Sequence, residues 1–247
     1  MRTKMIRPLA GRPAFTLVEL IVVLMILIGL AAILIPAVTD MVARTNRSTA
    51  SSNISEVAGA IQRYDAQYLA YPENLDSLVS SLTAGTALTT LNTTLAAALG
   101  DVTLSASTLA TLSTAGITSV GVHAATDDTF DMATPTALTS TSHLKGLSAA
   151  TQVSLGLETT GVLGKYIVLG VGSLNDMNGK TMIDAPVHFP RDAVNNPQIV
   201  YSRFLVVIQI TDGTTALNRA KVIGVIAPDA SALSGELSGY FYIAQNK

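Results

Sequence analysis

Oxygen-bearing side chains gather in one short stretch of the C-terminal half of the chain. Residues 175–184 read NDMNGKTMID, so Asn175, Asp176, Asn178 and Asp184 could offer oxygen ligands around a glycine. Calcium binds carboxylate and amide oxygens of this kind. The stretch lacks the acidic density and the bidentate glutamate of an EF-hand, and a polar turn whose side chains bond their own backbone is the competing interpretation. Calcium is therefore a candidate ligand, and no other cofactor is expected.

The other reactive side chains form no catalytic pattern. His123, His143 and His188 stand at no metal-ligand spacing, and each is expected on the surface or in a strand. No serine lies in a Gly-x-Ser-x-Gly elbow. The pair Gly170-Val-Gly172 lacks the third glycine of a dinucleotide-binding loop. The sequence therefore predicts a protein that is not an enzyme.

Composition narrows the class of protein further. The 247 residues suffice for one domain with an anchor or for two small domains, and they include enough apolar residues to bury a core. There is no cysteine, which excludes disulfides and cysteine zinc sites. The net charge of -2 argues against a nucleic-acid partner, because phosphate neutralisation needs clustered Lys and Arg.

Basic residues are concentrated ahead of one long apolar run. The run Leu20–Val38 contains no charged residue and is long enough for a helix to span a bilayer. It is apolar all round, which separates it from a surface helix. The basic residues before it predict a cytoplasmic N-terminus and a head outside the membrane. These basic residues are Arg2, Lys4, Arg7 and Arg12. A cleaved signal peptide, an uncleaved anchor and the core helix of a soluble protein are the simpler alternatives.

Glu19 stands at the edge of this run and is not explained by those alternatives. A charged side chain at the centre of a membrane helix costs about 2.5–3.5 kcal/mol. No Lys, Arg or His lies within a helical turn or two on its C-terminal side. Glu19 is therefore expected either to be solvated at the headgroup level or to find a partner in another chain.

The stretch GRPAFTLVEL at residues 11–20, followed by the apolar run, resembles the N-terminal segment of type IV prepilins and type II secretion pseudopilins. The resemblance implies that a prepilin peptidase removes residues 1–14 by cutting between Ala14 and Phe15, and then N-methylates Phe15. It also implies that Glu19, the fifth mature residue, pairs with the terminal ammonium group of a neighbouring subunit. The family usually has glycine before the cut, where this chain has Ala14.

The function that the resemblance implies is structural. The chain would be a subunit of a type IV pilus-like filament or a type II secretion pseudopilus, first held in the inner membrane with its head periplasmic or extracellular. Its partners would be further copies or other subunits of the filament, the prepilin peptidase, the inner-membrane assembly platform and membrane lipid. The alternative is a membrane-anchored extracytoplasmic binding domain that does not polymerise.

One long helix is expected to carry these features. Residues 15–38 would form its membrane or filament-core half, with a kink at Pro36, and residues 39–70 its amphipathic half. The stretch Tyr71–Leu78, with the pattern Tyr-Pro-x-x-Leu-x-x-Leu, follows the helix. It resembles the major pseudopilins of type II secretion, which favours secretion over the other filament systems.

The rest of the chain divides in two. Residues 71–160 are rich in Thr, Ser and Ala and are expected to form an insertion of short helices and loops. Residues 161–247 carry β-branched and aromatic runs and a hairpin turn at Asp212-Gly213. The expected strands are 166–169, 199–210, 220–226 and 238–243. The predicted fold class is α+β and pilin-like: a long N-terminal helix, its first half transmembrane, packed on a C-terminal antiparallel β-sheet.

Overall fold

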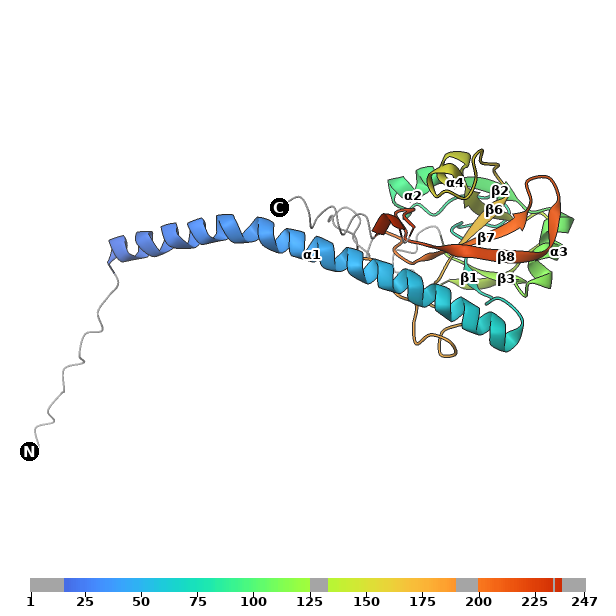
Figure 1. The fold of residues 1–247 in the computed structure, drawn as a ribbon, viewed down its shortest axis with the longest axis horizontal. Coiled ribbons are helices and arrows are strands. Elements are labelled where there is room, and N and C mark those ends of the chain that lie inside the picture. Colours follow the sequence, from blue (N-terminus) through green and yellow to red (C-terminus); the bar gives the residue numbers. More distant parts are fainter. Residues whose placement is uncertain (1–15, 125–132, 190–199, 233, 237–247) are drawn as a thin grey trace, which may run out of the picture. The chain divides into compact units, whose positions relative to one another are not determined.

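The computed structural model describes residues 16–124, 133–189, 200–232 and 234–236. The chain divides into two compact units, Met1–Val42 and Ala43–Lys247. A single helix, α1 (Leu17–Tyr68), runs from the first unit into the second (Figure 1). The predicted helix is confirmed over these residues, while Ala14 and Phe15 lie outside the described residues.

The first unit contains the apolar beginning of α1. Its large apolar side chains from Leu17 to Val42 are all exposed, and by length and composition the helix could cross a membrane. Pro36 lies inside α1 and does not end it, as expected. The hydroxyl of Thr39 donates a hydrogen bond of 2.9 Å to the carbonyl of Pro36 one turn back.

The second unit, called the head here, begins with the remaining part of α1. Most of its buried residues follow one another in steps of four and three, which is the spacing of a single helix face. These are Ala50, Ile54, Val57, Ile61 and Tyr64, and Ala43 and Ala60 are buried as well. The second part of α1 therefore carries a buried stripe from Ala50 to Tyr64, and the bounds 39–70 of the amphipathic half stay a prediction.

An eight-stranded mixed sheet fills the head (Figure 1). The strands are β1 (Leu75–Asp76), β2 (Leu99–Thr103), β3 (Ser119–Val122), β4 (Thr134–Ala137), β5 (His143–Leu147), β6 (Tyr166–Gly170), β7 (Leu205–Thr211) and β8 (Ala216–Ile226). On one side β6 pairs with β7 along its whole length, and β7 pairs with β8. On the other side β6 meets β5 through Ile167 and β1 through Gly170. The sheet therefore branches at β6, with β2 continuing the β5 branch and β3 and β4 continuing the β1 branch.

The sheet differs from the expected one in which residues form its strands and in the relative direction of two of them. Residues 71–160 do contain short helices, namely α2 (Thr93–Ala98), α3 (Ala106–Thr114) and α4 (Ala149–Ser154). The same region also supplies β1 to β5, which were not expected. The strands β6, β7 and β8 of the C-terminal region pair antiparallel, as predicted, but the sheet as a whole is mixed because β1 and β3 are parallel. The predicted strand 238–243 lies outside the described residues.

The core lies on both faces of the sheet because successive side chains of a strand point to opposite sides. Ile167 and Leu169 of β6 and alternate residues of β7 join the buried stripe of α1 and Leu112 of α3. Tyr166 and Val168 point the other way and pack with Leu95 of α2. The strands β6 and β7 are thus covered on both faces, which explains their continuous apolar runs.

Candidate functional sites

Glu19 lies in the first turn of α1 and is bonded to Thr16. Its Oε2 accepts hydrogen bonds of 2.9 Å from both the backbone N–H and the hydroxyl of Thr16. The backbone N–H of Glu19 donates in return to the Thr16 hydroxyl at 3.3 Å. This reciprocal arrangement is a capping box, which satisfies donors that the first turn of a helix leaves unpaired.

The capping box gives Glu19 a structural role at the start of the helix within its own chain. Its pattern, Thr-x-x-Glu ahead of an apolar run, can be recognised in a sequence and was missed. The carboxylate has no cationic partner nearby in the sequence, but it has polar partners in its own chain. Both bonds end on Oε2, and no other described residue donates a hydrogen bond to Oε1. The role of Glu19 in assembly stays a prediction.

The predicted calcium ligands act as turn-forming side chains. Asn175 donates to the carbonyl of Gly172 at 2.5 Å and accepts from the N–H of Met177 at 2.9 Å. Asn178 donates to the carbonyl of Ser173 at 2.7 Å.

The two carboxylates of the same loop also have partners within the chain. Asp176 accepts from the side-chain amide of the distant Asn74 and lies 3.8 Å from the ammonium group of Lys180. Asp184 accepts from the N–H of Ala185 at 2.7 Å. The bonds of Asn175, Asn178 and Asp184 to nearby backbone are those of the polar-turn interpretation, and calcium binding stays a prediction.

A buried polar group that the sequence did not indicate lies where β1 joins β6. Asp76 accepts a hydrogen bond of 2.7 Å from the hydroxyl of Tyr201, and its other oxygen lies 3.2 Å from Nε2 of His123. Each of the three residues is at most 1% exposed, and His123 directly follows β3, so it lies neither on the surface nor in a strand, the two positions expected. Burial, followed by the charge of Asp76, raises the pKa of Tyr201 well above its usual value.

Glycines make room for this group. An added β-carbon at Gly170 would collide with the hydroxyl of Tyr201, and one at Gly172 would collide with the carboxylate of Asp76. At Gly121 it would come within 3.2 Å of the same carboxylate. The group is enclosed by the strands it links, which suits a structural role rather than contact with a substrate.

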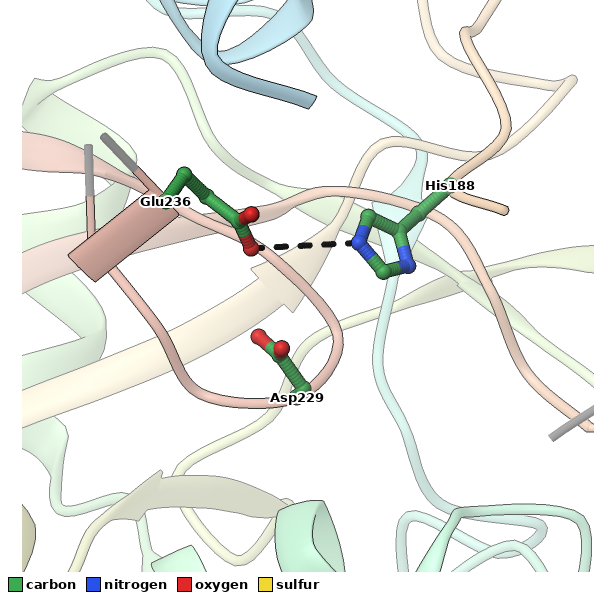
Figure 2. A group of neighbouring side chains, drawn as sticks. All are labelled: His188, Asp229 and Glu236. Atoms are coloured by element: carbon green, nitrogen blue, oxygen red, sulfur yellow. Dashed lines mark ion pairs between the residues drawn. The ribbon is translucent and has the colours of Figure 1, made fainter. Parts of the chain in front are cut away.

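A second group of titratable side chains lies where the loop after β8 approaches His188. The possible ligand atoms of His188, Asp229 and Glu236 all lie within 4.8 Å of one another, and their side chains converge on a common space (Figure 2). Within the part of the chain that the structure describes, this is the only group of three or more His, Asp or Glu residues so placed. His188 also departs from the expected surface or strand position, since it lies outside the strands and only 7% of it is exposed.

Arg47 and Ser231 complete this second group. Arg47, on α1, donates to Oε2 of Glu236 at 2.8 Å and to Oδ2 of Asp229 at 3.5 Å. The hydroxyl of Ser231 lies 2.5 Å from Oδ1 of Asp229 and 2.6 Å from Oε1 of Glu236. Glu236 is fully buried, so its charge is held by these contacts and not by solvent.

Comparisons with protein-family models, with curated proteins and with solved structures find no match to this chain.

Proposed function

We propose that this chain is the precursor of a structural subunit of a type IV pilus-like filament or a type II secretion pseudopilus. The observation that carries the proposal is the first part of α1, which has the carboxylate of Glu19 in its first turn and then the uncharged run Leu20–Val38 with exposed apolar side chains. Such a surface must be covered by lipid or by other apolar helices, because exposed apolar area on this scale is unstable in water. In a filament subunit this surface is covered by lipid before assembly and by other apolar helices after assembly.

The geometry around Glu19 supports the predicted pairing between subunits. The capping box engages Oε2, and no described residue donates to Oε1. If a peptidase cuts between Ala14 and Phe15, Thr16 stays in the mature chain and the box can persist. The new ammonium group of Phe15 in a neighbouring subunit could then approach Oε1, and the pair would reduce the cost of holding each charge in an apolar surrounding.

N-terminal sequencing of the mature protein tests the processing step. We expect the mature chain to begin at Phe15 and to carry a methylated amine. A mature chain that begins at any other residue would refute the assigned cleavage site.

Filament assembly is tested with Glu19→Val and a matched change elsewhere on α1. Surface filaments are sheared from cells and the subunit in them is quantified with an antibody to the head. We expect Glu19→Val to be retained in the membrane and lost from filaments, whereas Glu56→Val, at an exposed position of the head, assembles normally. Assembly of Glu19→Val at the wild-type level would exclude the pairing role. A wild-type protein found only as a membrane-bound monomer would favour the non-polymerising binding domain.

A further inference from the structure

The histidine of the second titratable group is unusually placed for a buried ring. No described residue forms a hydrogen bond with its side chain, and its Nε2 lies 3.9 Å from Oε1 of Glu236, which is too long for a hydrogen bond. The ring is 93% buried and its edge packs against Phe204 at a centroid distance of 5.9 Å. A buried imidazole normally has a partner for at least one nitrogen. His188 is therefore a polar side chain that faces two carboxylates and makes no hydrogen bond to either of them.

The carboxylate oxygens that face the His188 ring have fewer hydrogen-bond donors than their short contacts require. Ser231 lies 2.5 and 2.6 Å from two carboxylate oxygens, yet a hydroxyl carries a single hydrogen and can fully satisfy only one of them. The second short contact needs another proton or a cation between the oxygens. Arg47 does not supply it, because Arg47 binds the opposite oxygens, Oε2 and Oδ2.

The charge balance of the group leaves room for a cation. The carboxylates of Asp229 and Glu236 contribute two negative charges, and Arg47 contributes one positive charge. A neutral imidazole at His188 adds no charge to the group and offers a nitrogen lone pair to a cation. The group then carries one uncompensated negative charge in a buried place, which is costly without a counter-ion.

The backbone around the group is fixed by contacts with neighbouring elements. The N–H of His188 donates to the carbonyl of Ser202 at 2.8 Å. In the loop after β8, Asp229 accepts from the N–H of Ser231, and the side chain of Asn92 donates to the carbonyl of Pro228. The converging atoms are thus held by two separate segments of the head.

We infer that His188, Asp229 and Glu236 form a binding site for a divalent transition metal such as Zn²⁺ or Mn²⁺, with Ser231 beside the carboxylates. A mixed set of one imidazole nitrogen and carboxylate oxygens suits these ions, whereas Ca²⁺ and Mg²⁺ take oxygen ligands. Ligands at about 2.0–2.1 Å from Zn²⁺ stand roughly 3.3 Å apart in a tetrahedral site. The 3.9 Å separation of Nε2 and Oε1 therefore needs a shift of less than about 1 Å.

The proposed ion would join two parts of the head. Asp229 lies in the loop after β8 and Glu236 in the helical residues 234–236, and Arg47 already ties both to α1. An ion shared with His188 would add a bond to the segment in which Val187 forms an isolated antiparallel bridge with Arg203. A cavity of about 60 Å³, lined by His188 and by α1 residues including Asn46 and Asn53, borders the ring and is large enough for water to reach it.

Metal binding to the full-length chain in detergent tests this inference, with protein purified without a polyhistidine tag. Co²⁺ serves as a visible probe, and Zn²⁺, Ca²⁺ and Mg²⁺ serve as competitors. We expect one Co²⁺ per chain, displaced by Zn²⁺ and not by Ca²⁺ or Mg²⁺. His188→Ala and the isosteric Asp229→Asn should each weaken binding by at least about tenfold, as expected for the loss of a metal-site group.

Two matched variants make the outcome decisive. His143→Ala removes a histidine paired with Asp101 in another part of the head, and Asp184→Asn removes a carboxylate of the polar loop. Both should bind Co²⁺ as the wild type does. Absence of Co²⁺ and Zn²⁺ binding to the wild type, or unchanged binding in His188→Ala and Asp229→Asn, would overturn the site. Loss of binding in Asp184→Asn alone would place the ion in the loop of residues 175–184 instead.

Discussion

At the scale of single residues, Asp76 occupies a position where a carboxylate is costly. It sits in a two-residue strand between β3 and β6, and 1% of it is exposed. Its oxygens are directed at Tyr201 and His123, so removal of either partner would leave a buried charge less well satisfied. The strand can hold this carboxylate because the surrounding glycines leave space for it and for Tyr201.

Gly170→Ala tests that dependence. The new methyl group would meet the hydroxyl of Tyr201, and the strand cannot move without disturbing its pairing with β7. We expect a loss of about 1–3 kcal/mol or more in the free energy of unfolding, measured by urea denaturation. Gly224→Ala in β8 is the control, since no atom lies within 4 Å of its new carbon, and it should change stability by less than about 0.5 kcal/mol. Equal effects of the two changes would contradict the packing of this group.

The pH dependence of stability should report on Tyr166. Burial, followed by the hydrogen bond to Glu158, raises the pKa of Tyr166 to about 12. The folded state therefore keeps a proton that the unfolded state releases near pH 10, and stability falls as pH rises from about 10 to about 12.

Tyr166→Phe provides the comparison for this pH effect. The variant should show a shallower decline over the same pH range, measured by denaturant titration at each pH. Tyr201, whose pKa is also raised, remains in both proteins and accounts for the decline that persists. An identical slope in wild type and variant would contradict the raised pKa of Tyr166.

Interactions between residues close in the sequence can be predicted from the sequence, whereas pairings between residues far apart in the sequence cannot. The capping box of Thr16 and Glu19 lies within four residues and has a known signature. Asp76, His123 and Tyr201 meet only after the sheet has formed, and each alone resembles an ordinary polar residue. His188 and the residues after β8 likewise meet only in the folded head, so their positions in the sequence show no spacing typical of metal ligands.

At the scale of elements, the second part of α1 packs with α3 in the core on one face of the sheet. Ile61 is almost fully buried in that interface. Ile61→Ala should therefore cost about 2–5 kcal/mol in the free energy of unfolding of the head, because it leaves a cavity among packed side chains. Ser52→Ala, on the exposed face of the same helix, should be nearly neutral. Thermal or urea unfolding of both variants measures the difference, and a neutral Ile61→Ala would contradict the packing.

Strands with strong apolar runs were predictable, and weak ones were not. β6 lies where its run predicted it, and β8 begins four residues earlier than expected. In contrast, β2 reads LGDVT and β4 reads TPTA, with little apolar alternation. Their pairing with β5 and β3 fixes them, and this tertiary contribution overrides a low strand propensity.

At the scale of the whole molecule, the two units differ in how their apolar residues are covered. The head has its own core, while the apolar residues of the first unit are exposed. The full chain should therefore sediment with membranes and resist extraction by alkaline carbonate. A chain that begins at Ala43 should be found in the soluble fraction and should unfold with a thermal midpoint close to that of the full chain in detergent. Full-length protein that is released by carbonate would contradict a membrane-embedded helix.

The enclosure of Asp76 also has an evolutionary consequence. Gly121, Gly170 and Gly172 lie around one carboxylate, and the space they leave is useful only while that carboxylate and Tyr201 occupy it. Descendants that replace Asp76 with a smaller or apolar residue would lose the selection that keeps these glycines, and larger residues could then spread through the three positions. Positions 76, 121, 170 and 172 should therefore covary in an alignment of homologous sequences, more strongly with one another than with the rest of the sheet.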